Sequence, residues 1–131
     1  MLSVISARYF LYQEPTDMRK SFDGLCGLVT DKLGQNPMSG DLFIFVNKPR
    51  NRIKLLRWET GGFVLFYKRL EQGTFRLPTP SLSTDKKLII DYSELVMIIN
   101  GISLEKARKN NRFYSQNNVE KQWLKSTVPK L

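Results

Sequence analysis

The pattern that most constrains the fold of this chain is a predicted β-hairpin between residues 52 and 70. Arg52 to Glu59 and Phe63 to Leu70 are rich in branched and aromatic residues, and Thr60-Gly61-Gly62 separates them. Glycine at such a junction supplies the positive φ angles that tight hairpin turns need. Because an isolated hairpin is only marginally stable in water, the pattern predicts a larger sheet with a buried face.

The turn also predicts how the two strands pair. If Glu59 pairs with Gly62, counting back along both strands places Arg52 opposite Arg69. Alternate residues share a face, so one face is apolar near the turn and basic at its far end. Its members are Trp58, Phe63, Leu56, Leu65, Lys54, Tyr67, Arg52 and Arg69. The expected core side is the opposite face, with Ile53, Leu55, Val64, Phe66 and Leu70.

A helix is expected before this hairpin, from about Met18 to a stop at Gly34, since Thr16 or Asp17 can cap its start. Apolar residues recur there at three- and four-residue steps, the pattern of an amphipathic helix, at Met18, Phe22, Leu25, Val29 and Leu33. Gly24 and Gly27 interrupt this pattern and suggest a close approach to a sheet.

Further strands are expected at residues 8–12, 42–46, 74–77 and 86–90. Asp91 and Glu94 have capping-box spacing, which predicts a helix over residues 92–99. The sequence therefore predicts one α+β domain over residues 8–101, with a mainly antiparallel sheet of about five to six strands, an N-terminal amphipathic helix and one or more C-terminal helices. Residues 102–131 are expected to form a basic, partly helical tail, in which Ser103 can cap a short helix through about Lys109.

The positive charge of the chain is concentrated around the hairpin. The whole chain carries 21 Lys and Arg against 12 Asp and Glu, a formal charge of +9. Residues 47–76 hold eight basic and two acidic side chains, which leaves +6 in that block. Such clustering is typical of a surface that binds a polyanion, because neutralised phosphates release counterions. A basic surface that merely keeps the protein soluble is the alternative.

The predicted phosphate-contacting residues are the basic side chains at the far end of the hairpin and in the loop before it, Lys48, Arg50, Arg52, Lys54, Lys68 and Arg69. Tyr67 belongs to the same predicted nucleic-acid surface, where its ring could stack on an unpaired base. Trp58 and Phe63 are candidates for base stacking or for a partner surface, with core packing as the alternative.

Catalytic chemistry has little support in this sequence. The chain has no histidine, which removes Ser-His-Asp and Cys-His arrangements, and its single cysteine, Cys26, excludes a multi-cysteine zinc site. A magnesium cluster is conceivable from Asp17, Asp23, Asp31 and Asp41, but capping, turn and solvated-helix roles explain these residues. We therefore expect no catalytic residues, no metal and no cofactor. The first 12 residues make a poor signal peptide and no apolar run reaches about 20 residues, so a cytoplasmic protein is expected.

Several strings resemble the TnpB accessory protein, the second open reading frame product of insertion sequence sixty-six type elements. They begin with Asp17-Met18-Arg19-Lys20-Ser21-Phe22-Asp23-Gly24-Leu25 and Ser39-Gly40-Asp41-Leu42-Phe43-Ile44-Phe45-Val46-Asn47. They continue with Arg52-Ile53-Lys54-Leu55-Leu56, Trp58, Gly62-Phe63 and Tyr67-Lys68-Arg69-Leu70-Glu71-Gln72-Gly73-Thr74-Phe75. The resemblance covers roughly residues 8–101.

This resemblance implies a non-catalytic helper of transposition, encoded beside a separate transposase. The implied partners are DNA, at the transposon ends, and the transposase of the same element. With the charge pattern, it predicts binding of DNA backbone by a basic strand-and-loop surface. A protein adaptor that docks on the transposase, or an RNA-binding module, are the alternatives. No membrane partner is expected, and exposed strand edges are compatible with a homo-oligomer.

Overall fold

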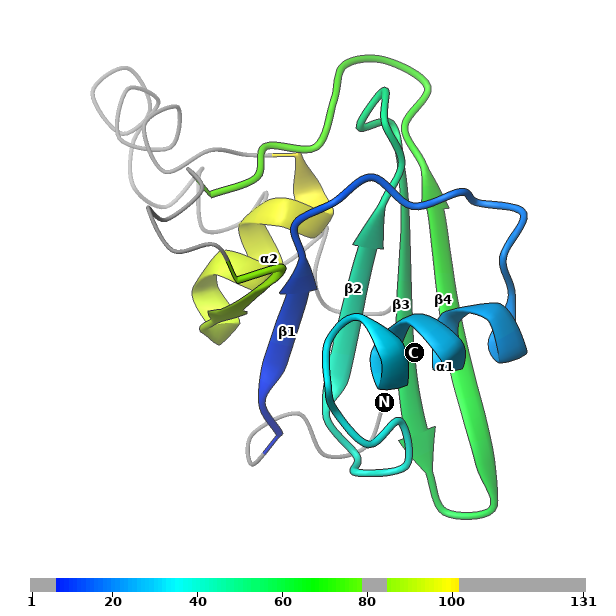
Figure 1. The fold of residues 1–131 in the computed structure, drawn as a ribbon. Coiled ribbons are helices and arrows are strands. Elements are labelled where there is room, and N and C mark those ends of the chain that lie inside the picture. The colour runs from blue at the N-terminus through cyan, green and yellow to red at the C-terminus, as the bar shows by residue number, and fades with distance from the viewer. Residues whose placement is uncertain (1–6, 79–84, 102–131) are drawn as a thin grey trace.

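A five-stranded sheet in the order β4-β3-β2-β1-β5 organises the structure, a computed structural model that describes residues 7–78 and 85–101 (Figure 1). Its strands are β1 (Tyr9–Tyr12), β2 (Leu42–Val46), β3 (Arg52–Glu59), β4 (Gly62–Arg69) and β5 (Lys87–Ile90). Two helices, α1 (Phe22–Asp31) and α2 (Tyr92–Asn100), complete the α+β fold. Neither of these helices, within the described ranges, is long and apolar enough to cross a membrane.

The pairing of the strands is mostly antiparallel, as predicted. The register of β3 and β4 is confirmed, since Glu59 pairs with Gly62 and Arg52 pairs with Arg69. One pair differs, because β1 lies parallel to β2 and α1 forms the connection between them. Parallel neighbours need such a crossover, whereas the two-residue turn between β3 and β4 suits antiparallel strands.

Each face of the sheet packs against one helix. On the α1 face, Leu25 and Val29 bury themselves against a cluster that includes Phe43 and Leu56. On the α2 face, Leu95 and Ile98 pack against strand residues that include Ile53 and Leu55. Alternate residues of a strand thus contribute to two separate hydrophobic clusters, one on each face of the sheet. β1 and β2 are buried along their whole length.

The predicted core side of the hairpin needs a correction. Ile53 and Leu55 are buried as expected, but Val64 and Phe66 are 38% and 39% exposed. They lie on β4, an edge strand, and no β4 residue belongs to the buried cluster that α2 joins. The opposite face of the hairpin also contributes to the core, since α1 covers it and Leu56 is fully buried there.

The N-terminal helix was predicted too early and too long. The structure has α1 as a ten-residue helix that follows β1 and begins at Phe22, with Ser21 as its N-cap and without a side-chain cap. Asp17 instead closes a separate turn, where its Oδ1 accepts a hydrogen bond from the Arg19 backbone N–H at 2.9 Å. Phe22 is 42% exposed and therefore does not belong to the buried stripe.

Three further predictions concern the strand at residues 74–77, the capping box of the second helix and the helix after Ser103. The strand predicted at residues 74–77 is absent: Phe75 is buried in a loop and its N–H donates to the carbonyl of Arg50. The capping box of α2 is confirmed, and Gly101 ends that helix with a φ of 70°. The helix predicted after Ser103 lies outside the described residues.

Candidate nucleic-acid interface

Four of the predicted contact residues, Lys48, Arg50, Arg52 and Arg69, lie at the edge of the sheet where β1 and β2 end. Because these strands are parallel, the loops that follow them meet, and the Thr16 N–H donates to the carbonyl of Val46 at 2.8 Å. Because β3 and β4 run antiparallel to their neighbours, β3 begins and β4 ends at the same edge, here called the loop edge. The first residue of β3 is Arg52 and the last of β4 is Arg69.

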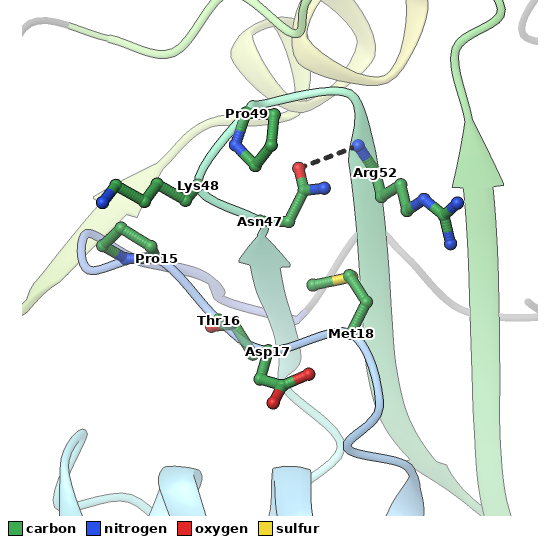
Figure 2. Close-up of a pocket in the computed structure, with 8 residues that line it drawn as sticks. All are labelled: Pro15, Thr16, Asp17, Met18, Asn47, Lys48, Pro49 and Arg52. Carbon is green, nitrogen blue, oxygen red and sulfur yellow. Dashed lines mark hydrogen bonds between the residues drawn. The ribbon is translucent and has the colours of Figure 1, made fainter.

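An open hollow of about 390 Å³ lies at the loop edge (Figure 2). Lys48 and Arg52 stand on opposite sides of it in Figure 2. Its lining comes from the two loops and the start of β3: Pro15, Thr16, Asp17, Met18, Asn47, Lys48, Pro49 and Arg52. The hollow therefore has cationic groups on its rim.

Asn47 holds the loop between β2 and β3 in a fixed shape. Its Oδ1 accepts hydrogen bonds from the backbone N–H groups of Asn51 and Arg52, both at 3.0 Å, and its Nδ2 donates to the Asn51 side chain. Arg50 adopts a φ of 59°, which only a few non-glycine residues do. This ordered loop presents two exposed cationic side chains, Lys48, which lines the hollow, and Arg50.

Arg52 and Arg69 lie side by side on the α1 face, as the predicted register requires. The Arg52 guanidinium donates to the Tyr67 hydroxyl oxygen at 2.9 Å. The Arg69 guanidinium pairs with Glu71 at 2.9 Å, although the Arg69 side chain remains 58% exposed. Surface ion pairs of this kind are weak, so a phosphate can compete with Glu71 for Arg69.

Lys54 serves the fold rather than the surface. The residue is only 6% exposed, and its Nζ donates to the carbonyls of Met18 and Lys20 at 2.8 and 2.7 Å. The same ammonium lies 4.6 Å from the centre of the Tyr67 ring. We therefore leave Lys54 out of the contact surface, despite its predicted place there.

Lys68 lies on the other face of the sheet from Arg52 and Arg69. Its Nζ donates to the carbonyl of Ile99 at 2.9 Å, near the carboxyl end of α2, where a cation is favourable. Arg57 points to that face as well and is buried, and its Nε donates to the carbonyl of Gly40. Part of the basic block thus stabilises the domain and does not face solvent at the loop edge.

Trp58 and Phe63 pack at the turn end of the hairpin. Their rings meet edge to face, with centroids 5.0 Å apart, and both side chains are half-buried. Phe63 also packs against the α1-face cluster. The pair is therefore part of the packing at the end of the hairpin opposite the loop edge.

The acidic groups near the interface already have partners. Hydrogen bonds from Arg19 lower the pKa of Asp17 to about 2, so this carboxylate at the hollow stays ionised and paired. Glu71 pairs with Arg69, whereas Asp41 lies before β2 at the opposite end of the sheet and accepts hydrogen bonds from Arg8 and Ser39. Over residues 7–78 and 85–101, no three Cys, Asp or Glu side chains come together as a group that could hold a metal ion.

The sequence model of one protein family matches residues 7–109, and that family is described as "IS66 Orf2 like protein". The chain belongs to this family. Two relatives from Sinorhizobium fredii (strain NBRC 101917 / NGR234) are similar to this IS66 Orf2-like protein. "Uncharacterized protein y4jC" is 28% identical over 102 residues, which cover 78% of this chain and 85% of the relative. "Uncharacterized protein y4hO" is 32% identical over 98 residues, with 74% and 82% covered. No solved structure matches the chain.

Proposed function

We propose that this IS66 Orf2-like protein is a non-catalytic accessory protein that assists transposition by binding the DNA backbone at the loop edge of its sheet. The observation that carries the proposal is the convergence of Lys48, Arg50, Arg52 and Arg69 at this edge, from the ordered loop and both strands of the hairpin. Membership of an insertion-sequence family supports DNA as the polyanion, at the transposon ends.

The chemistry of the four side chains suits backbone contact rather than base reading. Arginine and lysine on a strand edge and a loop supply charge and hydrogen bonds to phosphate oxygens, which fix position without reporting sequence. Of the helices in the described residues, α1 and α2 pack on the faces of the sheet, so neither is offered at this edge for insertion into a groove. The proposed binding is therefore weakly dependent on sequence and strongly dependent on salt.

The test is a titration of labelled duplex DNA by fluorescence anisotropy at several salt concentrations. Four neutralised phosphates correspond to a log–log slope of about −3 to −4. The double variant Arg50→Gln/Arg52→Gln is expected to reduce the steepness of that slope by about 2 and to weaken binding by an order of magnitude or more. An affinity that does not change with salt would refute the proposal.

A matched control removes the same charge elsewhere. Lys32 and Lys86 are exposed, and they lie on the β1–β5 side of the sheet, where Lys86 pairs with Glu14. Lys86 precedes β5 at the same end of the sheet as Arg52 and Arg69, but β1 and β2 separate it from the hairpin. Lys32→Gln/Lys86→Gln is expected to leave the salt slope nearly unchanged. Equal losses in the two double variants would show that net charge, not the hairpin and the loop before it, drives binding. Competition with single-stranded RNA in the same assay ranks the two nucleic acids.

The transposase is the proposed protein partner, and the exposed side chains of Val64 and Phe66 on the edge strand favour such docking. Co-purification of the two proteins after nuclease treatment tests it. Retention of the transposase by the wild-type protein and its loss from Val64→Ser/Phe66→Ser is the expected result. Retention that depends on intact DNA would instead indicate a DNA bridge and would exclude direct docking.

A further inference from the structure

We infer that Tyr67 forms a stacking site for an unpaired DNA base beside the phosphate-contacting arginines. This inference rests on the proposed function and narrows its ligand to DNA with unpaired nucleotides. Three aromatic residues on the α1 face of the hairpin could present a ring, and the structure separates them. The rings of Trp58 and Phe63 pack against each other, whereas Tyr67 is 47% exposed.

The ring of Tyr67 is held in place by side chains of the neighbouring strand β3. Lys54, its partner across β3, lies with its ammonium 4.6 Å from the ring centroid. That ammonium is itself fixed by the carbonyls of Met18 and Lys20. The hydroxyl of Tyr67 accepts a hydrogen bond from Arg52 at 2.9 Å. The ring therefore has a defined orientation before any ligand arrives.

The opposite side of the ring faces outward. β4 is the edge strand of the sheet, so no strand of the described part of the chain lies beyond Tyr67 on the side away from Lys54. One ring face is occupied by the ammonium, and the exposed part of the residue is then the other face and the ring edge. An aromatic plane fixed in this way loses little conformational entropy when a base stacks on it.

Phosphate contacts flank this plane. Arg69 is two residues further along β4 on the same face, and Arg52 contacts the Tyr67 hydroxyl directly. A nucleotide with its base on the ring would place its phosphates near these guanidinium groups. Stacking requires a base that is free of its complement, because the faces of paired bases are covered within the duplex. The combination therefore suits a single-stranded end or gap better than a continuous duplex.

The experiment compares oligo(dT) with a duplex that carries the same number of phosphates, both measured by fluorescence anisotropy with the full chain. The wild-type protein is expected to prefer the single strand. Tyr67→Leu is expected to weaken single-strand binding roughly tenfold and to change duplex binding little. Tyr67→Phe keeps the ring and is expected to retain the preference. Tyr92→Leu, the same substitution at an exposed tyrosine at the start of α2, is the control and is expected to behave as wild type.

The outcomes separate this inference from the proposed function. Salt-dependent duplex binding combined with an unchanged single-strand affinity in Tyr67→Leu overturns the stacking site and leaves backbone binding intact. Equal weakening for both DNA forms also overturns it, because a general contact would then be lost. Absence of binding to either DNA form refutes the proposed function itself. Thermal unfolding of each variant shows whether the domain remains folded, and Tyr67→Phe retains the test if Tyr67→Leu unfolds.

Discussion

Arg52 and Arg69 lie directly opposite each other on β3 and β4, yet their guanidinium groups turn to different partners. Arg52 donates to the hydroxyl of Tyr67, and Arg69 donates to the carboxylate of Glu71. Two like charges at opposed positions repel, so each partner lowers the cost of their proximity. A phosphate bound between the two arginines would lower this electrostatic cost for both of them at once.

The Glu71→Gln substitution is therefore predicted to strengthen DNA binding. It removes the carboxylate that holds Arg69, and the Glu71 side chain is 77% exposed, so the fold does not depend on it. The expected gain at low salt is about two- to fivefold, in line with the weakness of exposed ion pairs. Anisotropy titrations measure it, and Asp31→Asn on the exposed side of α1 is a control with the same change of charge. A gain of equal size in that control would contradict the specific role of Glu71.

The Lys54→Met substitution is predicted to destabilise the domain without removing DNA contacts. It leaves the carbonyls of Met18 and Lys20 without their buried donor, which costs roughly 2–3 kcal/mol. Lys68→Met, which frees the single carbonyl of Ile99, is expected to cost about 1 kcal/mol. Urea denaturation measures both changes. Unaltered stability of Lys54→Met together with weakened binding of duplex DNA would show that Lys54 contacts DNA after all.

The local parts of the fold could be predicted from the sequence. The Thr60-Gly61-Gly62 turn sets the register of β3 and β4, and the spacing of Asp91 and Glu94 sets the start of α2. Both features depend on residues that are neighbours along the chain. The same register places Arg52 and Arg69 together, so half of the candidate site follows from strand alternation alone.

The remaining features depend on contacts between distant residues. The carbonyls of Met18 and Lys20 are taken by the ammonium of Lys54, more than 30 positions away, and α1 begins only after them. Sequence alternation places Lys54 beside Tyr67 but does not reveal that the segment before α1 covers it. The parallel pairing of β1 with β2 and the burial of Arg57 have the same non-local origin.

Asp41 is predicted to make stability depend on pH in the acid range. Burial alone would raise its pKa, but hydrogen bonds from Arg8 and Ser39 outweigh burial and lower it. A carboxyl group with a lowered pKa in the folded state stabilises the fold above its unfolded pKa of about 3.9, and the contribution is lost as pH falls through the folded pKa. Asp41→Asn is therefore expected to cost about 1 kcal/mol at neutral pH and less below about pH 4. Urea denaturation at both pH values tests this, and a cost that persists unchanged at low pH would contradict it.

Glycine-to-alanine substitutions in α1 and at the end of α2 are predicted to change the free energy of unfolding in opposite directions. Gly27 and Gly24 were expected to allow a close approach of α1 to the sheet, but a Cβ at Gly27 would meet nothing within 4 Å, and one at Gly24 would meet only the side chain of Lys20. Gly27→Ala is therefore predicted to raise the free energy of unfolding by about 0.5–1 kcal/mol, through higher helix propensity. Gly101 adopts a φ of 70° at the end of α2, so Gly101→Ala is predicted to lower the free energy of unfolding by about 1 kcal/mol. Both values come from urea denaturation of the full chain. Destabilisation by Gly27→Ala would mean that the open space beside α1 is filled in solution.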